Sequence, residues 1–187
     1  MFFFTQGLIA DEQTELKKHF LSKIDEVILI VEDKKLLKDE RNANIVKTLT
    51  PMFDFKLMAK LSLGNRWKEL SQADKDKFVE LYVHRMKQSY SSKIDAYKDE
   101  KVEVKEIQQP KEDRIALITD LISKQDKLEI VYKFHKPKKQ LESKDNWLVY
   151  DVEILGVSIL KTDIAQFKEF LQTKTITALM DALSKQS

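Results

Sequence analysis

The stretch Trp147–Leu160 reads WLVYDVEILGVSIL and decides the fold that we expect for the chain. Apolar and polar residues alternate in it up to Ile154, which is the pattern of a strand with one buried face. Gly156 then allows a sharp bend, and Ser158 stands where its side chain would cap a following helix. The expected inner face of this strand is formed by Leu148, Tyr150, Val152 and Ile154.

Three further strands are expected upstream, because apolar residues recur there with a period of two. These segments are Val102 to Ile107, Arg114 to Ile122 and Leu128 to His135. Short polar connections separate them, so the pattern predicts an antiparallel meander.

Helical periodicity dominates on both sides of the strands. The expected helices are Asp11 to Val31, Asp39 to Leu63, Gln72 to Tyr97, Lys161 to Leu171 and Thr175 to Leu183. Pro51 should kink or split the second of them, and Gly64 fits its C-terminal stop. Ser71 followed by Asp74 resembles a capping box that would begin the third.

The order of helices, then strands, then helices is typical of an α+β fold. We expect helices packed on one face of a curved antiparallel sheet of about four strands. Where a sheet curls away from its helices, the space must be filled by side chains or by a ligand. The pattern therefore predicts an apolar cavity between the two layers.

Composition limits the classes of function. The 187 residues suit one domain, and 33 Lys and Arg balance 31 Asp and Glu to a net charge of +2. That balance does not favour nucleic acid as a partner. The chain has no cysteine, which excludes disulfides, thiolate nucleophiles and Cys-based zinc sites. It also has no apolar run of roughly 18 residues that could span a bilayer.

The first ten residues, MFFFTQGLIA, resemble the back half of a secretory signal with cleavage after Ala10. On this interpretation residues 1–10 are a remnant of a signal peptide, and residues 11–187 form the single functional domain. The other interpretation is an apolar strap that packs on the domain.

Catalytic and metal-binding patterns are weak. His19, His84 and His135 lie in three different elements without metal-ligand spacing, and His135 is expected to be exposed. Asp151 and Glu153 share one face of the last strand, which is more typical of a solvent-facing side than of paired acids. We therefore expect no catalytic residue, no metal and no cofactor.

Two long motifs carry a specific resemblance. Phe53–Trp67 reads FDFKLMAKLSLGNRW and resembles the FDF-x-x-M-A-x-x-x-L-G-x-x-W pattern of the MlaC family, also described as the toluene-tolerance or ABC-transporter auxiliary family. Trp147–Ser158 is similar to that family's W-x-V-Y-D-V-x-I-x-G-V-S. One departure is clear, because Thr162, Asp163 and Ile164 replace the family's usual Asn-Tyr-Arg, so any contact made by that Tyr or Arg is in doubt.

The resemblance implies a soluble phospholipid carrier of the periplasm that is not an enzyme. It would shuttle glycerophospholipids between an outer-membrane lipoprotein complex and an inner-membrane ABC transporter with a substrate-binding ring, and so maintain outer-membrane lipid asymmetry. Acyl chains would be buried between sheet and helices, with the phosphate near solvent. We expect a monomer.

The expected lipid-binding residues are the large apolar side chains of both motifs and of the elements between and after them. They are Phe55, Met58, Leu61, Phe78, Tyr82, Met86, Ile130, Tyr132, Tyr150, Val152, Ile154, Val157, Leu160 and Phe167. Lys60, Arg66 and Arg85 are candidates for contacting a head group or a docking surface. Two alternatives stay open: a periplasmic enzyme of cone-shaped α+β fold acting on an apolar substrate, and a chaperone or adaptor for amphipathic polypeptides.

Overall fold

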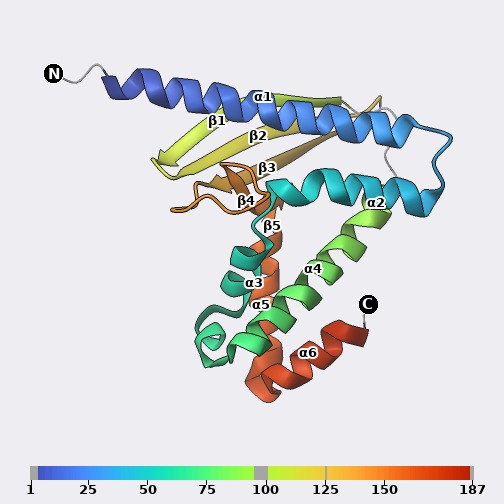
Figure 1. Cartoon of the computed structure of the whole chain (residues 1–187), viewed down its shortest axis with the longest axis vertical. Coiled ribbons are helices and arrows are strands. Elements are labelled where there is room, and N and C mark those ends of the chain that lie inside the picture. Colours follow the sequence, from blue (N-terminus) through green and yellow to red (C-terminus); the bar gives the residue numbers. More distant parts are fainter. Residues whose placement is uncertain (1–3, 95–100, 125, 186–187) are drawn as a thin grey trace.

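The computed structural model describes residues 4–94, 101–124 and 126–185, and shows the expected α+β fold (Figure 1). The helices are α1 (Phe4–Glu32), α2 (Lys38–Leu49), α3 (Phe55–Leu63), α4 (Gln72–Ile94), α5 (Ile159–Thr173) and α6 (Ile176–Lys185). Two 3₁₀ helices, η1 (Thr50–Met52) and η2 (Gly64–Glu69), flank α3. The strands are β1 (Lys101–Lys111), β2 (Arg114–Ile122), β3 (Lys127–His135), β4 (Leu148–Ile154) and β5 (Val157–Ser158).

The strands form one curved sheet in the order β1-β2-β3-β4-β5, and each pair of neighbours is antiparallel. The predicted meander is thus confirmed, with the two-residue β5 added at the edge beside β4. The turn between β4 and β5 uses positive φ angles at Leu155 (50°) and Gly156 (76°). This tight turn places the short strand β5 beside β4, and α5 begins immediately after β5.

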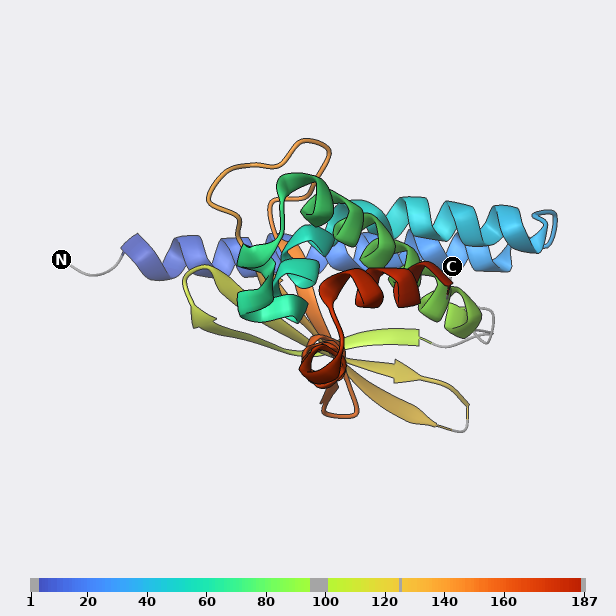
Figure 2. The ribbon, with the colours of Figure 1, turned by 90° about the horizontal axis from the view of Figure 1, so that it is seen from below.

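Helix α1 runs across one face of the sheet, and α2 returns beside it (Figures 1 and 2). The remaining helices, α3 to α6, extend away from the sheet below the β4–α5 connection (Figure 1). The molecule therefore has a layered part, α1 on the sheet, and a helical part. None of the helices in the described ranges combines the length and apolarity needed to cross a bilayer.

Local signals in the sequence set the ends of the helices. The segment Asp39 to Leu63 is split at Pro51, since α2 ends at Leu49 and α3 begins at Phe55. Gly64 ends α3 with a φ of 55°. The backbone N–H of Asp74 donates to Ser71 Oγ over 3.1 Å, which confirms the predicted cap at the start of α4. The expected end of α4, residues 95–97, lies outside the described residues.

The buried apolar residues fall into two clusters. The sheet cluster joins α1 to the inner face of the sheet and is centred on Phe20, Ile115, Leu117, Phe134 and Val149. The helical cluster joins α3, α4, α5 and α6 and contains Met58, Phe78, Tyr82, Met86 and Phe167. Phe53 and Ile159 pack against both clusters, so the two cores meet where β4 passes into α5.

The predicted inner face of β4 is wrong in its first half. Lys133 of β3 pairs with Asp151, but the next residue, Phe134, pairs with Val149, so Tyr150 is an extra residue in β4. Such a bulge reverses the alternation on one side of it. Val149 consequently joins the sheet cluster in the place expected for Tyr150, which packs against the helical cluster instead.

Candidate functional site

The space between α1 and the inner face of the sheet is the candidate site. At one end of this layer the side chains are completely covered: Ile115, Leu117 and Phe134 are each at most 1% exposed. They face Leu16 and Phe20 of α1, which belong to the same cluster. This end is an ordinary close-packed core.

Farther along the same strands the covering becomes incomplete. Val104 of β1, Ile130 of β3 and Ile154 of β4 all point to the inner face, yet each is only half-buried. Ile24 of α1, which packs against the same cluster, is half-buried as well. These side chains form a patch of apolar surface that the protein's own residues leave partly accessible. An apolar ligand that binds here would bury this surface and remove it from water.

Tyr132 lies at the centre of this inner face. It is paired with Leu117 on β2 and with Val152 on β4. The centroid of its ring is 4.8 Å from that of Phe20 on α1. Burial raises the pKa of Tyr132 to about 12, so the phenol is neutral near pH 7.

The helical cluster is packed differently. Met58, Phe78 and Tyr82 are 0% exposed. The Phe78 ring lies edge-on to Trp67 and to Phe167, with centroid distances of 6.4 and 6.0 Å. Edge-to-face packing of aromatic rings is a favourable arrangement in a protein core. Half-buried apolar residues such as Phe55, Leu70 and Tyr150 remain at the edge of this cluster.

The fourteen expected lining residues are therefore distributed over both clusters. Ile130, Tyr132, Val152 and Ile154 lie in or against the sheet cluster. Phe55, Met58, Phe78, Tyr82, Met86, Tyr150 and Phe167 lie in or against the helical cluster. Leu160 is buried, whereas Leu61 and Val157 are 37% and 61% exposed. The structure thus brings four of them together beneath α1.

The predicted lining residues include none from α1 or β1, although both elements pack in this layer. Phe20, Leu21 and Ile24 of α1 and Val102, Val104 and Ile107 of β1 all pack in or against the sheet cluster. Their helical and strand periods were visible in the sequence. Nothing in those periods shows which element faces the incompletely covered part of the sheet.

A buried ion pair occupies the position where the chain departs from the MlaC pattern. Asp163 is 2% exposed, accepts a hydrogen bond of 2.7 Å from the Tyr82 hydroxyl and forms an ion pair with Arg85. Burial raises the pKa of Asp163 against the opposing effects of these two partners. The Arg85 guanidinium also lies 5.5 Å from the centre of the Phe167 ring. Asp163 thus ties α5 to α4.

The candidate head-group cations are placed outside the layer beneath α1. Arg85 is engaged by Asp163, and Arg66 forms an exposed pair with Glu69 at 3.1 Å. Lys60 is exposed on α3. Their role toward a head group stays a prediction.

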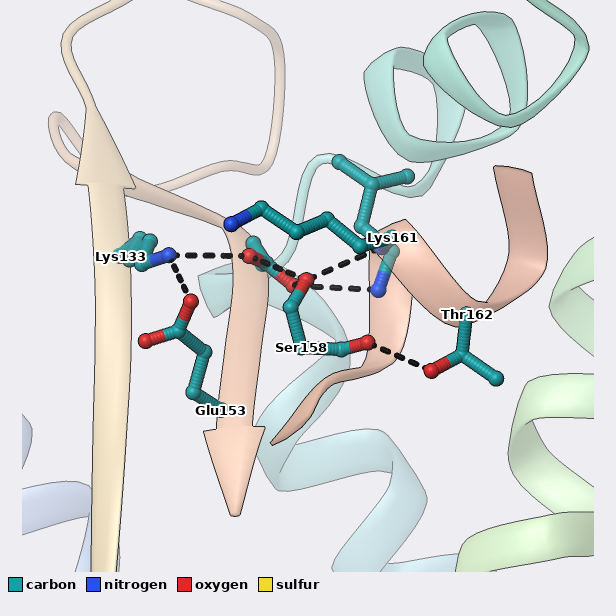
Figure 3. A network of polar contacts seen from close by, with 7 residues as sticks. Lys133, Glu153, Ser158, Lys161 and Thr162 are labelled. Carbon is teal, nitrogen blue, oxygen red and sulfur yellow. Dashed lines mark hydrogen bonds and ion pairs between the residues drawn. The ribbon is translucent and has the colours of Figure 1, made fainter. Parts of the chain in front are cut away.

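Ser158 lies at the centre of a polar network at the start of α5 (Figure 3), and its main side-chain partner is Asp151. Ser158 Oγ donates to the Asp151 carboxylate over 2.8 Å and accepts from the Lys161 backbone N–H over 3.0 Å. The Leu160 N–H and Lys133 Nζ also donate to Asp151, over 3.1 and 3.3 Å. The prediction that Ser158 caps the helix is confirmed.

The expectation that Asp151 faces solvent is wrong, since it is 3% exposed. The helix that follows β5 folds back over this part of β4 and covers the carboxylate. Lys133 also pairs with Glu153, and the pKa of Lys133 is raised because these carboxylates outweigh the opposing effect of its burial. The network joins β3, β4 and the first turn of α5.

His135 was expected to be exposed and is instead 7% exposed. Its Nε2 lies 2.9 Å from Asp54 Oδ2, while Asp54 Oδ1 accepts from the Leu57 N–H over 2.9 Å as the cap of α3. Burial alone would raise the pKa of Asp54, but the hydrogen bonds and charges of its neighbours lower it. The Asp54 N–H also donates to the Val149 carbonyl over 2.9 Å. The two motifs of the sequence are thereby joined directly.

The described residues form no cluster of metal ligands, and their buried carboxylates are paired. No three His, Cys, Asp or Glu side chains in those ranges gather as metal ligands. The three buried carboxylates are all engaged: Asp120 by Lys105 and Lys127, and Asp151 and Asp163 as above. Carboxylates held in this way serve to join elements of the fold.

A pocket of about 650 Å³ lies at the closed end of the layer, between α1 and the loop before β4. Its walls carry both signs of charge, with Glu12 and Glu15 opposite Lys136 and Lys144. His19 Nε2 lies 2.8 Å from Asp145 Oδ2 across it. This polar lining differs from the apolar surface farther along α1.

Comparisons with known proteins agree with this architecture. A phospholipid-binding protein from Ralstonia solanacearum, solved in complex with a phospholipid, superimposes with a TM-score of 0.77 at 14% identity, covering 90% of this chain and 94% of that chain. No match is found among curated proteins. The family model named MlaC protein matches residues 22–185. The chain therefore belongs to the MlaC family.

Proposed function

We propose that this protein is a periplasmic carrier of glycerophospholipids. It would move lipid between an outer-membrane lipoprotein complex and an inner-membrane ABC transporter with a substrate-binding ring, and thereby maintain outer-membrane lipid asymmetry. Membership of the MlaC family and the fold shared with a phospholipid-binding protein support this proposal.

The observation that carries the proposal is the incompletely covered apolar face beneath α1. Val104 of β1, Ile130 of β3 and Ile154 of β4 are half-buried on the side that α1 covers. We place the acyl chains against this surface. The helical cluster borders it through Phe53 and Ile159, and a lining role for its members remains a prediction.

The energetics require an apolar lining of this kind. At about 0.8 kcal/mol per CH₂ group, a lipid with two acyl chains loses on the order of 20 kcal/mol or more on entering water. Hydrogen bonds to the head group contribute about 1 kcal/mol each and cannot replace that amount. A face of Ile, Val and Phe side chains also tolerates different chain lengths, which suits a carrier of membrane lipids.

We infer further that the protein is a carrier and not an enzyme. The Ser158 hydroxyl and the Asp151 carboxylate are bonded to each other and to the first turn of α5. An activated serine needs a general base that can take its proton, and no histidine is among the bonded partners. The network therefore supports a structural role.

Lipid analysis of the purified protein tests the carrier proposal. The protein is exported to the periplasm of a bacterial host, purified without detergent and examined by native mass spectrometry followed by lipid extraction. We expect a mass increment of one phospholipid and recovery of glycerophospholipid from the extract. Recovery of protein free of phospholipid, together with failure to take up phospholipid from vesicles, would contradict the proposal.

A further inference from the structure

The two-residue turn between β4 and β5 places a leucine where the backbone disfavours one. Ile154 pairs with Val157, and the residues between them, Leu155 and Gly156, have φ angles of 50° and 76°. Turns with positive φ at both central residues favour Asn-Gly, because most side chains are strained in this region and asparagine tolerates it well. Leucine therefore lowers the stability of the folded chain at this position.

Burial does not offset that strain. The Leu155 side chain is 68% exposed, and that of Val157 is 61% exposed. The Leu155 N–H donates to the Glu129 carbonyl over 3.1 Å, so the turn is tied to β3 and its conformation is fixed. A strained and solvent-exposed leucine in an ordered turn indicates a contact with something outside the chain.

The exposed turn is continuous with the candidate lipid-binding face. One row of paired residues crosses the whole sheet on its inner side and consists of Val104, Thr119, Ile130, Ile154 and Val157. Residues that pair directly across two strands point to the same face. Val104, Ile130 and Ile154 are half-buried, whereas Val157 at the end of the row is exposed. The row therefore leads from the layer beneath α1 to solvent at β5.

The small size of the exposed turn favours a bilayer over a protein as its partner. Two side chains cannot supply the roughly 800 Å² that each partner of a stable protein interface buries. Insertion into a bilayer needs no matching pocket, because apolar side chains gain free energy simply by leaving water. Residues 155–157 carry no charge that would resist transfer toward hydrocarbon. A weak contact of this kind also lets a carrier leave the membrane again.

We propose that Leu155 and Val157 insert into the surface of a phospholipid bilayer and bring the open end of the inner face against it. The inference rests on the proposed carrier function, since the bilayer is then the source or the destination of the lipid. An acyl chain would pass between the bilayer and the row that ends at Val157 with little of its surface exposed to water.

A polarity-sensitive fluorophore at position 155 tests the insertion directly. The chain has no cysteine, so Leu155→Cys can be labelled with a nitrobenzoxadiazole group at that site alone. Vesicles of phosphatidylethanolamine and phosphatidylglycerol should raise its emission several-fold, equally at low and at physiological salt. Leu37→Cys with the same label is the matched control, because Leu37 is 71% exposed just before α2. Its emission should stay unchanged.

Leu155→Asn separates a role in docking from a role in folding. Asparagine tolerates the positive φ, so the temperature of thermal unfolding should not fall. The initial rate of phospholipid uptake from vesicles, with no other protein present, should nevertheless drop about tenfold because one apolar side chain no longer leaves water. Leu37→Asn removes an equally accessible leucine and should keep the rate of the original protein.

The outcomes separate the inference from the carrier proposal. Uptake of lipid by the original protein without a change of emission at position 155 would overturn the inference, leave the carrier function standing and favour a protein as the partner of the turn. An equal response at position 37, or undiminished uptake by Leu155→Asn, would also overturn it.

Separation of the loaded protein from the vesicles distinguishes the bilayer from the bound lipid. The emission at position 155 should then return to its value in buffer. Emission that stays high would show that the label meets the bound lipid and not the bilayer, which overturns the inference. Absence of uptake by the original protein, whatever the emission, would count against the carrier function itself.

Discussion

The rings of Phe20 and Tyr132 are tilted by 58° with their centroids 4.8 Å apart, and this contact fixes α1 over the middle of the sheet. On one side of it lie the completely buried residues Ile115 and Phe134. On the other side lie half-buried residues such as Ile130. The contact thus divides the layer beneath α1 into a packed core and the part where we place acyl chains.

A bulky side chain in that part should exclude lipid. Ile130→Trp adds volume on the inner face of β3, so we expect the protein to stay folded and its bound phospholipid to fall several-fold. The measurement is the lipid-to-protein ratio after purification. Val131→Trp is the matched control, because Val131 is the next residue and its side chain points to the opposite face. Equal lipid loss in both variants would contradict the placement of the ligand.

The ion pair of Asp163 with Arg85 should stabilise the fold without affecting lipid uptake. Asp163→Leu leaves the Arg85 charge and the Tyr82 hydroxyl without their partner, so unfolding in urea should show a loss of about 3 kcal/mol. The triple variant Tyr82→Phe, Arg85→Met, Asp163→Leu removes all three polar groups and should recover most of that loss. If the triple variant is as unstable as the single one, altered packing and not the unpaired charge is the cause.

Loss of the Ser158 hydroxyl should weaken the start of α5. Ser158→Ala removes the cap on the Lys161 N–H and one partner of buried Asp151, so we expect about 2 kcal/mol lower stability. Ser158→Thr keeps the hydroxyl and should retain most of the stability. Phospholipid uptake by folded Ser158→Ala should be unchanged. Hydrolysis of phospholipid by the original protein, lost in this variant, would favour an enzyme instead.

The pairing of Asp54 with His135 should appear in the pH dependence of stability. The pKa of Asp54 is lower in the folded protein than its ordinary value of 3.8. Its carboxylate therefore stabilises the fold at pH values above 3.8, and this contribution is lost as the pH falls through the folded pKa. Asp54→Asn keeps an acceptor for the Leu57 N–H but has no charge to lose.

Urea unfolding at several pH values measures that effect. Near pH 7 the original protein should be more stable than Asp54→Asn by about 1 to 2 kcal/mol, as for a charged hydrogen bond. The difference should shrink as the pH is lowered below 3.8. A difference that is independent of pH over this range would show that the Asp54 charge makes no contribution.

Signals that act over a few residues were sufficient to predict most of the fold. Pro51 follows the end of α2, Gly64 ends α3 and Ser71 caps α4, because each acts on the backbone near itself. The strands followed from their period of two, and their short connections fixed the meander. Local chemistry of this kind is visible in any single sequence.

The errors concern features that depend on distant residues. The bulge at Tyr150 is set by the pairing of β4 with β3. The alternation of apolar and polar residues in β4 alone does not reveal that one residue is extra. His135 is buried and paired with Asp54, which lies 81 residues away along the chain. The lining was the least predictable part, because a side chain in a solid core, such as Phe78, and one beside a ligand, such as Ile130, have the same apolar character.

Photo-crosslinking tests the central claim most directly. A glycerophospholipid with a diazirine near the end of one acyl chain is loaded into the protein and irradiated, and the labelled residues are mapped by peptide mass spectrometry. The account predicts labels on the inner side of α1 around Phe20 to Val31 and on inner residues of β1, β3 and β4 such as Val104, Ile130 and Ile154. Labels confined to the helical cluster of α3 to α6, or to the outer face of the sheet, would contradict it.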